Sequence, residues 1–375
     1  MDMNISIYEI LEQAVQDEDV SDIFLVAGLP VTMKRNGRQK RMGGRMMMPD
    51  VIGQLVDQIY REARRDRGRL ERGEDDDFSL SMPRRTTENG IFPGGRFRIN
   101  VFRQRGSLAA VIRVIRFELP DPVRLGIPEE VLSLADTGGG LVLVTGAAGT
   151  GKSTTLACMI DRINSMRDCH IITMEDPIEY IHRHKKAIVT QREISIDTPG
   201  YLDALRSALR ESPDVIFLGE MRDYDTITSA LIAAETGVLV FSTLHTSGAA
   251  DTISRIVDVF PDKEQARVQL AQVLKSVVCQ QLVPSTEEDD NGNQIRIPVF
   301  EILKVTDAVQ NMIRENKVNQ LDSVMQSGMS EGMCTMDGSL LKLYEQKKIT
   351  KPTALKFRTH YGYEYMEKRL DGQKQ

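Results

Sequence analysis

The stretch Gly146-Ala-Ala-Gly149-Thr-Gly151-Lys152-Ser153 decides how this chain of 375 residues is interpreted. It fits the pattern G-x-x-x-x-G-K-[ST] completely. The apolar run 141–145 precedes it, and an apolar repeat at helical spacing follows it, formed by Leu156, Met159, Ile160 and Ile163. A glycine-rich turn without a ligand is the alternative. The pattern and its strand-to-helix context together favour a phosphate-binding loop.

The chemistry of this loop follows from its residue types. Glycines let the backbone wrap closely enough for successive N–H groups to point at phosphate oxygens, and the positive end of the following helix adds to that field. Lys152 can reach the β- and γ-phosphates, and Ser153 can place its hydroxyl on Mg²⁺. The predicted nucleotide-binding residues are Gly146, Ala147, Ala148, Gly149, Thr150, Gly151, Lys152, Ser153 and Thr154.

The composition excludes several classes of protein. Hydrophobic residues make up 41% and charged residues 27%, which excludes a disordered polymer, a collagen and a small disulfide scaffold. A net charge of −6 argues against a surface built for nucleic acid, so no nucleic-acid partner is expected. The four cysteines include no Cys-x-x-Cys pair, and no stretch approaches the ~18 apolar residues of a membrane span. We therefore expect a soluble intracellular protein.

Two domains are expected, 1–120 and 121–375. The first has an opening helix at 7–15, a hairpin around Asn36-Gly37 and a second hairpin across Gly106-Ser107. Two prolines in 119–122 mark the boundary, because they interrupt regular structure. Beyond it, apolar runs at 141–145, 171–174, 215–218 and 238–242 alternate with helical patterns. This alternation predicts an α/β fold with a parallel sheet, and the chain becomes mostly helical from about 303.

Polar residues follow three of these predicted strands. Glu175 and Asp176 come after one, Glu220 after the next, and His245 after the last. Because ligands bind beyond the carboxyl ends of parallel strands, we expect these side chains near the phosphate loop. A carboxylate there can hold Mg²⁺ or orient the attacking water, and Glu220 is the better base candidate because an entirely apolar strand leads into it. Glu175 and Asp176 are the candidate metal ligands together with Ser153.

Several residues keep two interpretations. His245 is either a structural residue or a functional one, and its position favours function. His182 and His184 lie in a basic stretch without metal-ligand spacing, so solvated surface is favoured. Arg206 and Arg210 lie one turn apart on a predicted short amphipathic helix. They are either ordinary salt-bridge residues or ligands of the γ-phosphate. The charged stretch 61–77 is interpreted as a solvated surface.

The segments around these residues resemble the secretion and pilus-assembly ATPases. The stretch 209–223, LRESPDVIFLGEMRD, resembles the family's signature, 172–180 its aspartate box, and 234–237 with 242–246 its histidine box. The similarity extends from Ser21 to about Lys356 and is greatest to the type IV pilus retraction (twitching-motility) ATPases. Residues 308–315, AVQNMIRE, resemble the C-terminal retraction motif AIRNLIRE, and the chain lacks the tetracysteine zinc module of extension relatives.

This resemblance implies a RecA-like ATPase domain, a smaller PAS-like α+β domain at 1–120, and a hexameric ring that binds ATP and Mg²⁺ at subunit boundaries. It assigns catalytic support to Glu175, the Walker B glutamate to Glu220 and phosphate sensing to His245. It also places Arg98 and Arg113 of the N-terminal hairpin, together with Arg206 and Arg210, among residues that contact nucleotide.

The function implied is a cytoplasmic motor, at the inner face of the membrane, that powers type IV pilus retraction against an inner-membrane platform protein, either alone or beside a second pilus ATPase. One alternative is a pilus-extension, secretion or DNA-translocating ring of the same superfamily. Another is a nucleotide-gated regulatory subunit without turnover, against which Lys152, Ser153, Glu175 and Glu220 argue. The residues leave open whether Glu220 or Glu175 is the general base.

Overall fold

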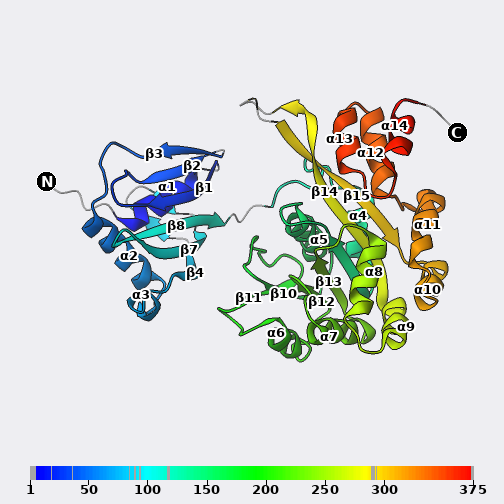
Figure 1. Ribbon diagram of the computed structural model, residues 1–375. Helices are drawn as coiled ribbons and strands as arrows, with labels where there is room; N and C mark the ends of the chain where they lie inside the picture. The colour runs from blue at the N-terminus through cyan, green and yellow to red at the C-terminus, as the bar shows by residue number, and fades with distance from the viewer. Residues whose placement is uncertain are drawn as a thin grey trace. The chain divides into compact units, whose positions relative to one another are not determined.

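The computed structural model describes residues 6–17, 19–35, 37–83, 85–87, 90–92, 94–115, 119–288, 292 and 294–372 (Figure 1). The chain divides into two compact units. The N-terminal unit comprises Met1–Glu118 with Glu179–Ile181, and the larger unit comprises Leu119–Ile178 with His182–Gln375. Asn36 of the first predicted turn lies outside the described residues.

An antiparallel sheet forms the N-terminal unit. Within the described part of that unit, six strands pair in the order β3-β2-β1-β8-β7-β4, and β5 pairs with β6 separately. The elements are α1 (Ile7–Gln16), β1 (Val20–Leu25), β2 (Thr32–Arg35), β3 (Arg38–Arg41), α2 (Pro49–Glu62), α3 (Gly68–Glu71), β4 (Asp76–Met82), β5 (Arg85–Thr87), β6 (Gly90–Phe92), β7 (Gly95–Gln104) and β8 (Ser107–Ile115). Both predicted hairpins, β2–β3 and β7–β8, are therefore confirmed.

Alternation along β7 separates the two faces of this sheet. Phe97, Ile99 and Val101 are fully buried in one core with Ile52 and Ile59 of α2. The intervening residues of β7 are only partly buried, as a period of two requires.

One buried carboxylate fastens α2 to the edge strand β4. Asp76 accepts hydrogen bonds from the Tyr60 hydroxyl at 2.8 Å and from Arg65 at 2.8 and 2.9 Å. The predicted solvated stretch 61–77 therefore contains one buried carboxylate, Asp76, which is paired with the exposed Arg65.

The larger unit is built on a mostly parallel sheet. Its seven strands, counted over the described residues, run in the order β11-β10-β12-β13-β9-β14-β15, and only β15 is antiparallel to its neighbour. The strands are β9 (Gly140–Thr145), β10 (His170–Glu175), β11 (Ile188–Glu193), β12 (Val215–Leu218), β13 (Leu239–Leu244), β14 (Leu274–Glu288) and β15 (Gln294–Lys304).

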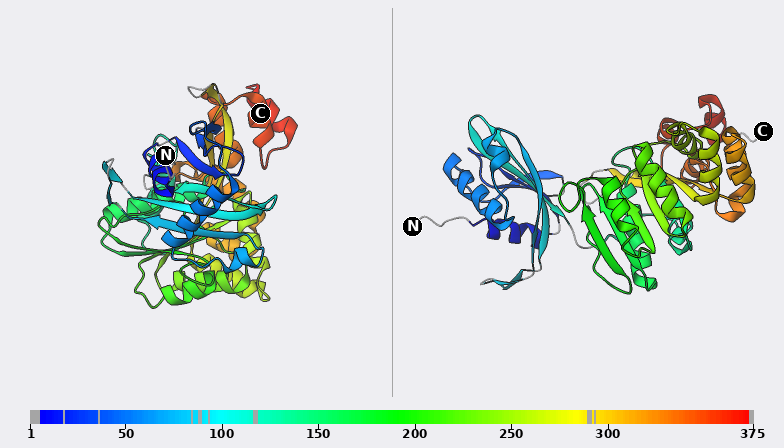
Figure 2. Two further views of the ribbon diagram at one scale, coloured as in Figure 1. Left: turned by 90° about the vertical axis from the view of Figure 1, so that its left-hand side faces the viewer. Right: turned by 90° about the horizontal axis from the view of Figure 1, so that it is seen from below.

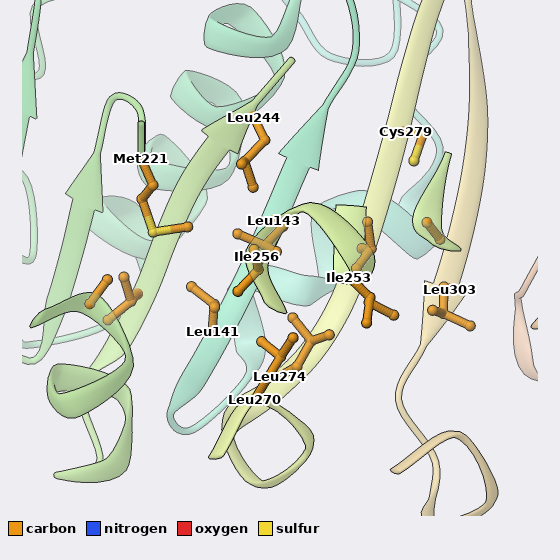
Figure 3. Packing of buried hydrophobic residues seen from close by; sticks show 14 of the residues in the cluster. Leu141, Leu143, Met221, Leu244, Ile253, Ile256, Leu270, Leu274, Cys279 and Leu303 are labelled. Carbon is orange, nitrogen blue, oxygen red and sulfur yellow. The ribbon is translucent and has the colours of Figure 1, made fainter. Parts of the chain in front are cut away.

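Helices cover both faces of this sheet, which explains why its strands are continuously apolar. Leu141 and Leu143 of β9 pack into one core with Ile253, Ile256 and Leu270, as Figure 3 shows. Val142 and Val144 point the other way, into a second core with the helix that follows the phosphate loop. The covering helices are α4 (Glu129–Leu132), η1 (Ser133–Asp136), α5 (Lys152–Met166), α6 (Tyr201–Ala208), α7 (Tyr224–Glu235), α8 (Ala249–Asp258) and α9 (Lys263–Val273).

The C-terminal part is helical, as predicted from about 303. Figures 1 and 2 show its helices, in orange and red, gathered at one end of the larger unit beside β14 and β15. They are α10 (Asp307–Arg314), η2 (Val318–Gln320), α11 (Leu321–Ser327), η3 (Gly328–Glu331), α12 (Met336–Glu345), α13 (Lys351–Phe357) and α14 (Tyr363–Leu370). Among the described helices, none is long and apolar enough to span a bilayer.

The predicted fold class is confirmed: an α/β unit with a covered parallel sheet, a smaller α+β unit and a helical C-terminal part. The four predicted apolar runs are β9, β10, β12 and β13, each within one or two residues of its predicted limits. The helix predicted to carry both Arg206 and Arg210 ends at Ala208, so Arg210 lies in the turn that follows it. The domain limits 1–120 and 121–375, and the PAS-like assignment, stay predictions.

Candidate nucleotide-binding site

The phosphate loop connects β9 to α5 and depends on glycine at two positions. Gly146 has φ 142° and Gly151 has φ 87°, conformations that side-chain-bearing residues rarely adopt. A Cβ atom at Gly146 would lie 2.3 Å from the carbonyl oxygen of Gln280, which leaves no room for any other residue. The glycine pattern of the sequence therefore reflects both backbone conformation and the close approach of β14.

Lys152 begins α5 and folds its side chain back over the loop. Its Nζ donates hydrogen bonds to the carbonyl oxygens of Gly146 at 2.8 Å and Ala147 at 2.9 Å. The side chain is buried although it carries a charge. Ser153 and Thr154 follow on the first helical turn, half-buried. The loop is thus preformed, with its cation held where phosphate oxygens would arrive.

Strand register brings the other predicted residues to the same edge of the sheet. Thr145, the last residue of β9, is paired with Leu244 of β13, and Ser242 of β13 is paired with Leu218 of β12. Leu218 is in turn paired with Met174 of β10. Because Glu175, Glu220 and His245 follow these positions by one or a few residues, all three lie at the edge that carries the phosphate loop.

Glu175 is the last residue of β10 and is buried. Its Oε1 accepts a hydrogen bond from the Thr173 hydroxyl at 2.7 Å and from the Gln191 amide at 3.3 Å. These donors fix the carboxylate in one orientation. Asp176, the next residue, is exposed.

Glu220 follows β12 after Gly219 and is less deeply buried. Its Oε2 lies 2.6 Å from Nε of Arg222 and 3.8 Å from Nε2 of His245. His245 and Arg222 are both more than half exposed, so the carboxylate lies between two side chains that face solvent. Glu220 can therefore reach a water molecule, whereas Glu175 is held by neutral donors.

The chain is similar to known proteins. The family described as type II/IV secretion system protein matches residues 109–345. The type IV pilus retraction ATPase PilT of Pseudomonas aeruginosa is 42% identical over 341 residues, covering 90% of this chain and 94% of that protein. The twitching motility protein of Neisseria gonorrhoeae is 43% identical, covering 85% and 82%. The chain belongs to the type II/IV secretion family.

A solved structure extends the likeness to the fold. The crystal structure of the pilus retraction motor PilT with bound ADP matches this secretion ATPase with a TM-score of 0.82 at 44% identity, covering 94% of this chain and 97% of that one. The predicted resemblance to pilus retraction ATPases is confirmed, and so is the prediction that the chain is an ATPase. The ADP of the related structure supports a nucleotide of this type as ligand.

Gln280 is a residue of the site that sequence reasoning missed. It is buried on β14, and its Oε1 accepts a hydrogen bond from the Thr155 hydroxyl of α5 at 2.8 Å. Its amide nitrogen would lie 3.0 Å from a Cβ at Gly151. Gln280 therefore braces the phosphate loop of this secretion ATPase from behind. A polar pair inside the apolar run 277–283 was the signal that could have revealed it.

Tyr201 is a second residue that was missed. A Cβ at Gly219 would lie 2.9 Å from its hydroxyl, so any side chain there would displace the phenol, which lies beside Gly219 and Glu220. Burial, and then the negative charges of Glu220, Asp176 and Glu175, raise the pKa of Tyr201 well above its usual value. The phenol stays protonated and can donate a hydrogen bond into this group of carboxylates.

Arg98 and Arg113 face each other as paired residues of β7 and β8. Each contacts an aspartate of its own unit: Arg98 lies 2.7 Å from Asp77, and Arg113 lies 3.1 Å from Asp22. Their predicted contact with nucleotide stays a prediction.

The predicted contact of Arg206 and Arg210 with phosphate stays a prediction. Both are exposed, and Arg210 precedes Glu211, whose carbonyl oxygen is 2.9 Å from Nδ1 of His170. His170 begins β10, at the edge opposite the phosphate loop. Contact of Arg210 with phosphate would therefore need a neighbouring chain.

The prediction that His182 is solvated was wrong. His182 is buried, its N–H donates to Oε1 of Gln191 at 2.8 Å, and burial lowers the pKa of its imidazole to about 4. The charged residues beside it in the sequence concealed this, because they lie on the outer side of the same segment. His184 is exposed, as predicted.

The candidate Mg²⁺ ligands have suitable chemistry. Ser153 offers a hydroxyl, and Glu175 and Asp176 offer carboxylates, which are the hard oxygen donors that Mg²⁺ prefers. Glu175 is held in one orientation by the hydrogen bonds that it accepts from Thr173 and Gln191.

Proposed function

We propose that this secretion ATPase is a hexameric motor that hydrolyses ATP to power retraction of type IV pili. The observation that supports it most is the preformed phosphate loop beside Glu220 and Glu175 in a chain 42% identical to a pilus retraction ATPase. The motor acts in the cytoplasm at the inner face of the membrane. Its partners are an inner-membrane platform protein and, in some systems, a second pilus ATPase.

The residues of the site divide the chemistry of hydrolysis. Loop N–H groups and Lys152 hold the β- and γ-phosphates, and Lys152 exchanges its carbonyl acceptors for phosphate oxygens. Ser153, Glu175 and Asp176 would hold Mg²⁺, which would neutralise charge that develops on the phosphates. Glu220 accepts a proton from the attacking water, and His245, 3.8 Å away, senses whether the γ-phosphate is present.

A neighbouring subunit completes the site. An arginine from the next subunit, Arg98 or Arg113, would stabilise the charge of the transition state at the γ-phosphate. Hydrolysis would then depend on how the units are placed, which converts chemistry into movement. Arg206 and Arg210, which are both exposed, are candidates for the same kind of contact across a boundary.

A genetic experiment tests the direction of work. Deleting the gene, and complementing it with the wild type or with Glu220→Gln, should yield cells that carry many surface pili but do not twitch unless the wild type is supplied. Bald cells after deletion would instead indicate pilus extension. Normal pili with a defect in DNA uptake would indicate a DNA-translocating ring.

A biochemical experiment tests turnover itself. Purified wild-type protein should hydrolyse ATP, and Glu220→Gln should bind it without comparable turnover. Absence of hydrolysis in the wild type, with binding intact, would support the regulatory subunit instead.

A further inference from the structure

A buried carboxylate on β15 holds three separate segments of the larger unit. Glu301 is fully buried. Its Oε1 accepts a hydrogen bond from the N–H of Ala249 at 2.8 Å, and its Oε2 accepts one from the N–H of Met336 at 3.2 Å. The same Oε2 lies 3.3 Å from Nε2 of His360. Glu301 thus joins the start of α8, the start of α12 and the segment before α14.

One side of this group leads to the nucleotide site. Ala249 begins α8 four residues after His245, and the N-cap residue of α8 is Gly248, which has no side chain to cap the helix. Glu301 supplies the missing acceptor, and its negative charge suits a helix N-terminus. A Cβ at Gly248 would lie 3.5 Å from the imidazole of His360, so the loop after His245 packs directly on that ring.

A second connection reaches the base of the phosphate loop. The hydroxyl of Thr145, directly before Gly146, donates to Sγ of Cys279 at 3.1 Å. The Cys279 thiol is in turn hydrogen-bonded to Glu301, and burial holds its pKa far above the usual range, so it remains a thiol that can donate. Figure 3 shows Cys279 on β14, the strand beside Leu143 of β9.

The other side of the group leads into the C-terminal helices. Nδ1 of His360 lies 3.1 Å from Asp322 of α11. Buried Asp337 of α12 accepts hydrogen bonds from the N–H groups of Thr359, His360 and Tyr361, at 2.7 to 2.8 Å. The imidazole therefore stands between Glu301 and Asp322, and its backbone is fixed by Asp337.

His360 carries a positive charge at neutral pH. The hydrogen bond with Glu301 outweighs burial and, with the charges of Glu301, Asp322 and Asp337, raises the pKa of His360 to about 9. Burial raises the pKa of Asp322, and the positive charge of His360 opposes that effect. Asp251 of α8 contributes a further negative charge near Asp322. A protonated imidazole among these carboxylates makes the contact between Glu301 and His360 charge-assisted.

We propose that Glu301 and His360 are positioning residues that couple the nucleotide site to the C-terminal helices, through the loop after His245 on one side and Asp337 and Asp322 on the other. Movement of that loop when the γ-phosphate is bound or lost would change the contact of Gly248 and Ala249 with this pair. By thermodynamic reciprocity, a load on the C-terminal helices would also change nucleotide affinity. The inference rests on the proposed role of His245 as the sensor.

Hydrogen exchange on the purified full-length protein tests this coupling. Amides of residues 359–361 should exchange at different rates with and without a non-hydrolysable ATP analogue, by about 5-fold or more if the coupling is of ordinary size. Glu301→Gln and His360→Asn should remove this difference while analogue affinity changes little. Lys351→Met, which breaks the exposed pair with Asp371 in the same group of helices, is the control and should keep the difference.

Kinetics supply a readout that a merely structural role would not move. We expect both variants to lower kcat for ATP, because the loop after His245 loses its support, and to leave KM nearly unchanged. The kcat of the wild type should fall as pH rises through about 9, and His360→Asn should lack that fall.

Three outcomes would overturn the proposal. The first is an exchange rate at 359–361 that does not respond to the analogue in the wild type, although the analogue binds. The second is a response that persists in His360→Asn. This variant serves if Glu301→Gln fails to fold, because the His360 side chain is partly exposed whereas Glu301 is fully buried. The third is a pH profile that the two proteins share. Failure to bind the analogue at all would instead contradict the nucleotide site.

Discussion

The carboxyl edge of the parallel sheet and the β7–β8 hairpin of the N-terminal unit both carry charged residues that we assign to nucleotide chemistry. At the sheet edge, Glu175, Glu220 and His245 arrive from three strands and meet because of strand register. On the hairpin, Arg98 and Arg113 are direct neighbours, yet each contacts an aspartate of its own unit. The first region is organised within one chain, whereas an arginine of the second would have to exchange its aspartate for a phosphate in order to act as we propose.

The largest effect should follow from the sheet edge. Lys152→Ala should abolish ATP turnover, because it removes the cation that faces the phosphates. The fold should persist, since the loop lies beyond the sheet and the Lys152 ammonium group donates to carbonyl oxygens of the loop itself. Steady-state ATPase assays and thermal unfolding would measure both, with Lys351→Met as the control. Activity within a few-fold of the wild type would refute the site.

The hairpin should show its effect only across a boundary between subunits. Arg113→Ala should lower turnover by as much as ~10³–10⁵, the range known for arginines supplied to a γ-phosphate. Mixed rings of Arg113→Ala and Lys152→Ala subunits should regain part of the activity, because some sites then combine an intact loop with an intact arginine. Hybrid rings that form and remain inactive would place the arginine outside the reaction.

The two carboxylates of the sheet edge should differ. Glu220→Gln should lower kcat by about 10²–10⁴ with ATP binding retained, since a positioned proton acceptor contributes that much. Glu175→Gln should act more through Mg²⁺, so its activity should improve as Mg²⁺ is raised. Titrating Mg²⁺ for both variants would compare them, and the opposite pattern would exchange their roles.

The brace behind the loop should have a smaller effect. Gln280→Ala should lower kcat by about 10- to 100-fold, because a slight misplacement of reacting groups costs that much. Gln281→Ala, on the neighbouring and less buried position of β14, is the matched control. Equal rates for the two variants would remove Gln280 from the site.

The smallest effect on turnover should come from replacing Asp76 in the N-terminal unit. This replacement should lower the stability of the fold and leave the chemistry of the site unchanged. Burial alone would raise the pKa of Asp76, but hydrogen bonds from Arg65 and Tyr60 outweigh it and lower the pKa below its usual value. The stabilisation is therefore present at neutral pH and is lost as pH falls below about 4. Asp76→Asn should lower the unfolding temperature at pH 7. The difference in unfolding temperature between this variant and the wild type should become smaller below about pH 4.

The contrast between the two regions also explains what could be predicted from the sequence. The phosphate loop and its flanking strands depend on local patterns of glycine and apolar residues, so they were found. The polar pair 280–281 marks Gln280, but its contact with the phosphate loop depends on sheet order. The contact of Tyr201 with Gly219 depends on how α6 packs, which no local pattern reveals. His182 was misjudged for a similar reason, because its segment lies beside β11, where Gln191 accepts a hydrogen bond from the backbone N–H of His182.

The length of β14 has a mechanical consequence. This strand of 15 residues contacts the phosphate loop through Gln280. Farther along, it contacts the C-terminal part, where the N–H of Thr286 donates to the carbonyl oxygen of Lys348 at 2.9 Å. At roughly 3.4 Å per residue, these two points lie about 20 Å apart. If the strand rotates as one piece by about 5° about Gln280, Thr286 and Lys348 move sideways by about 2 Å.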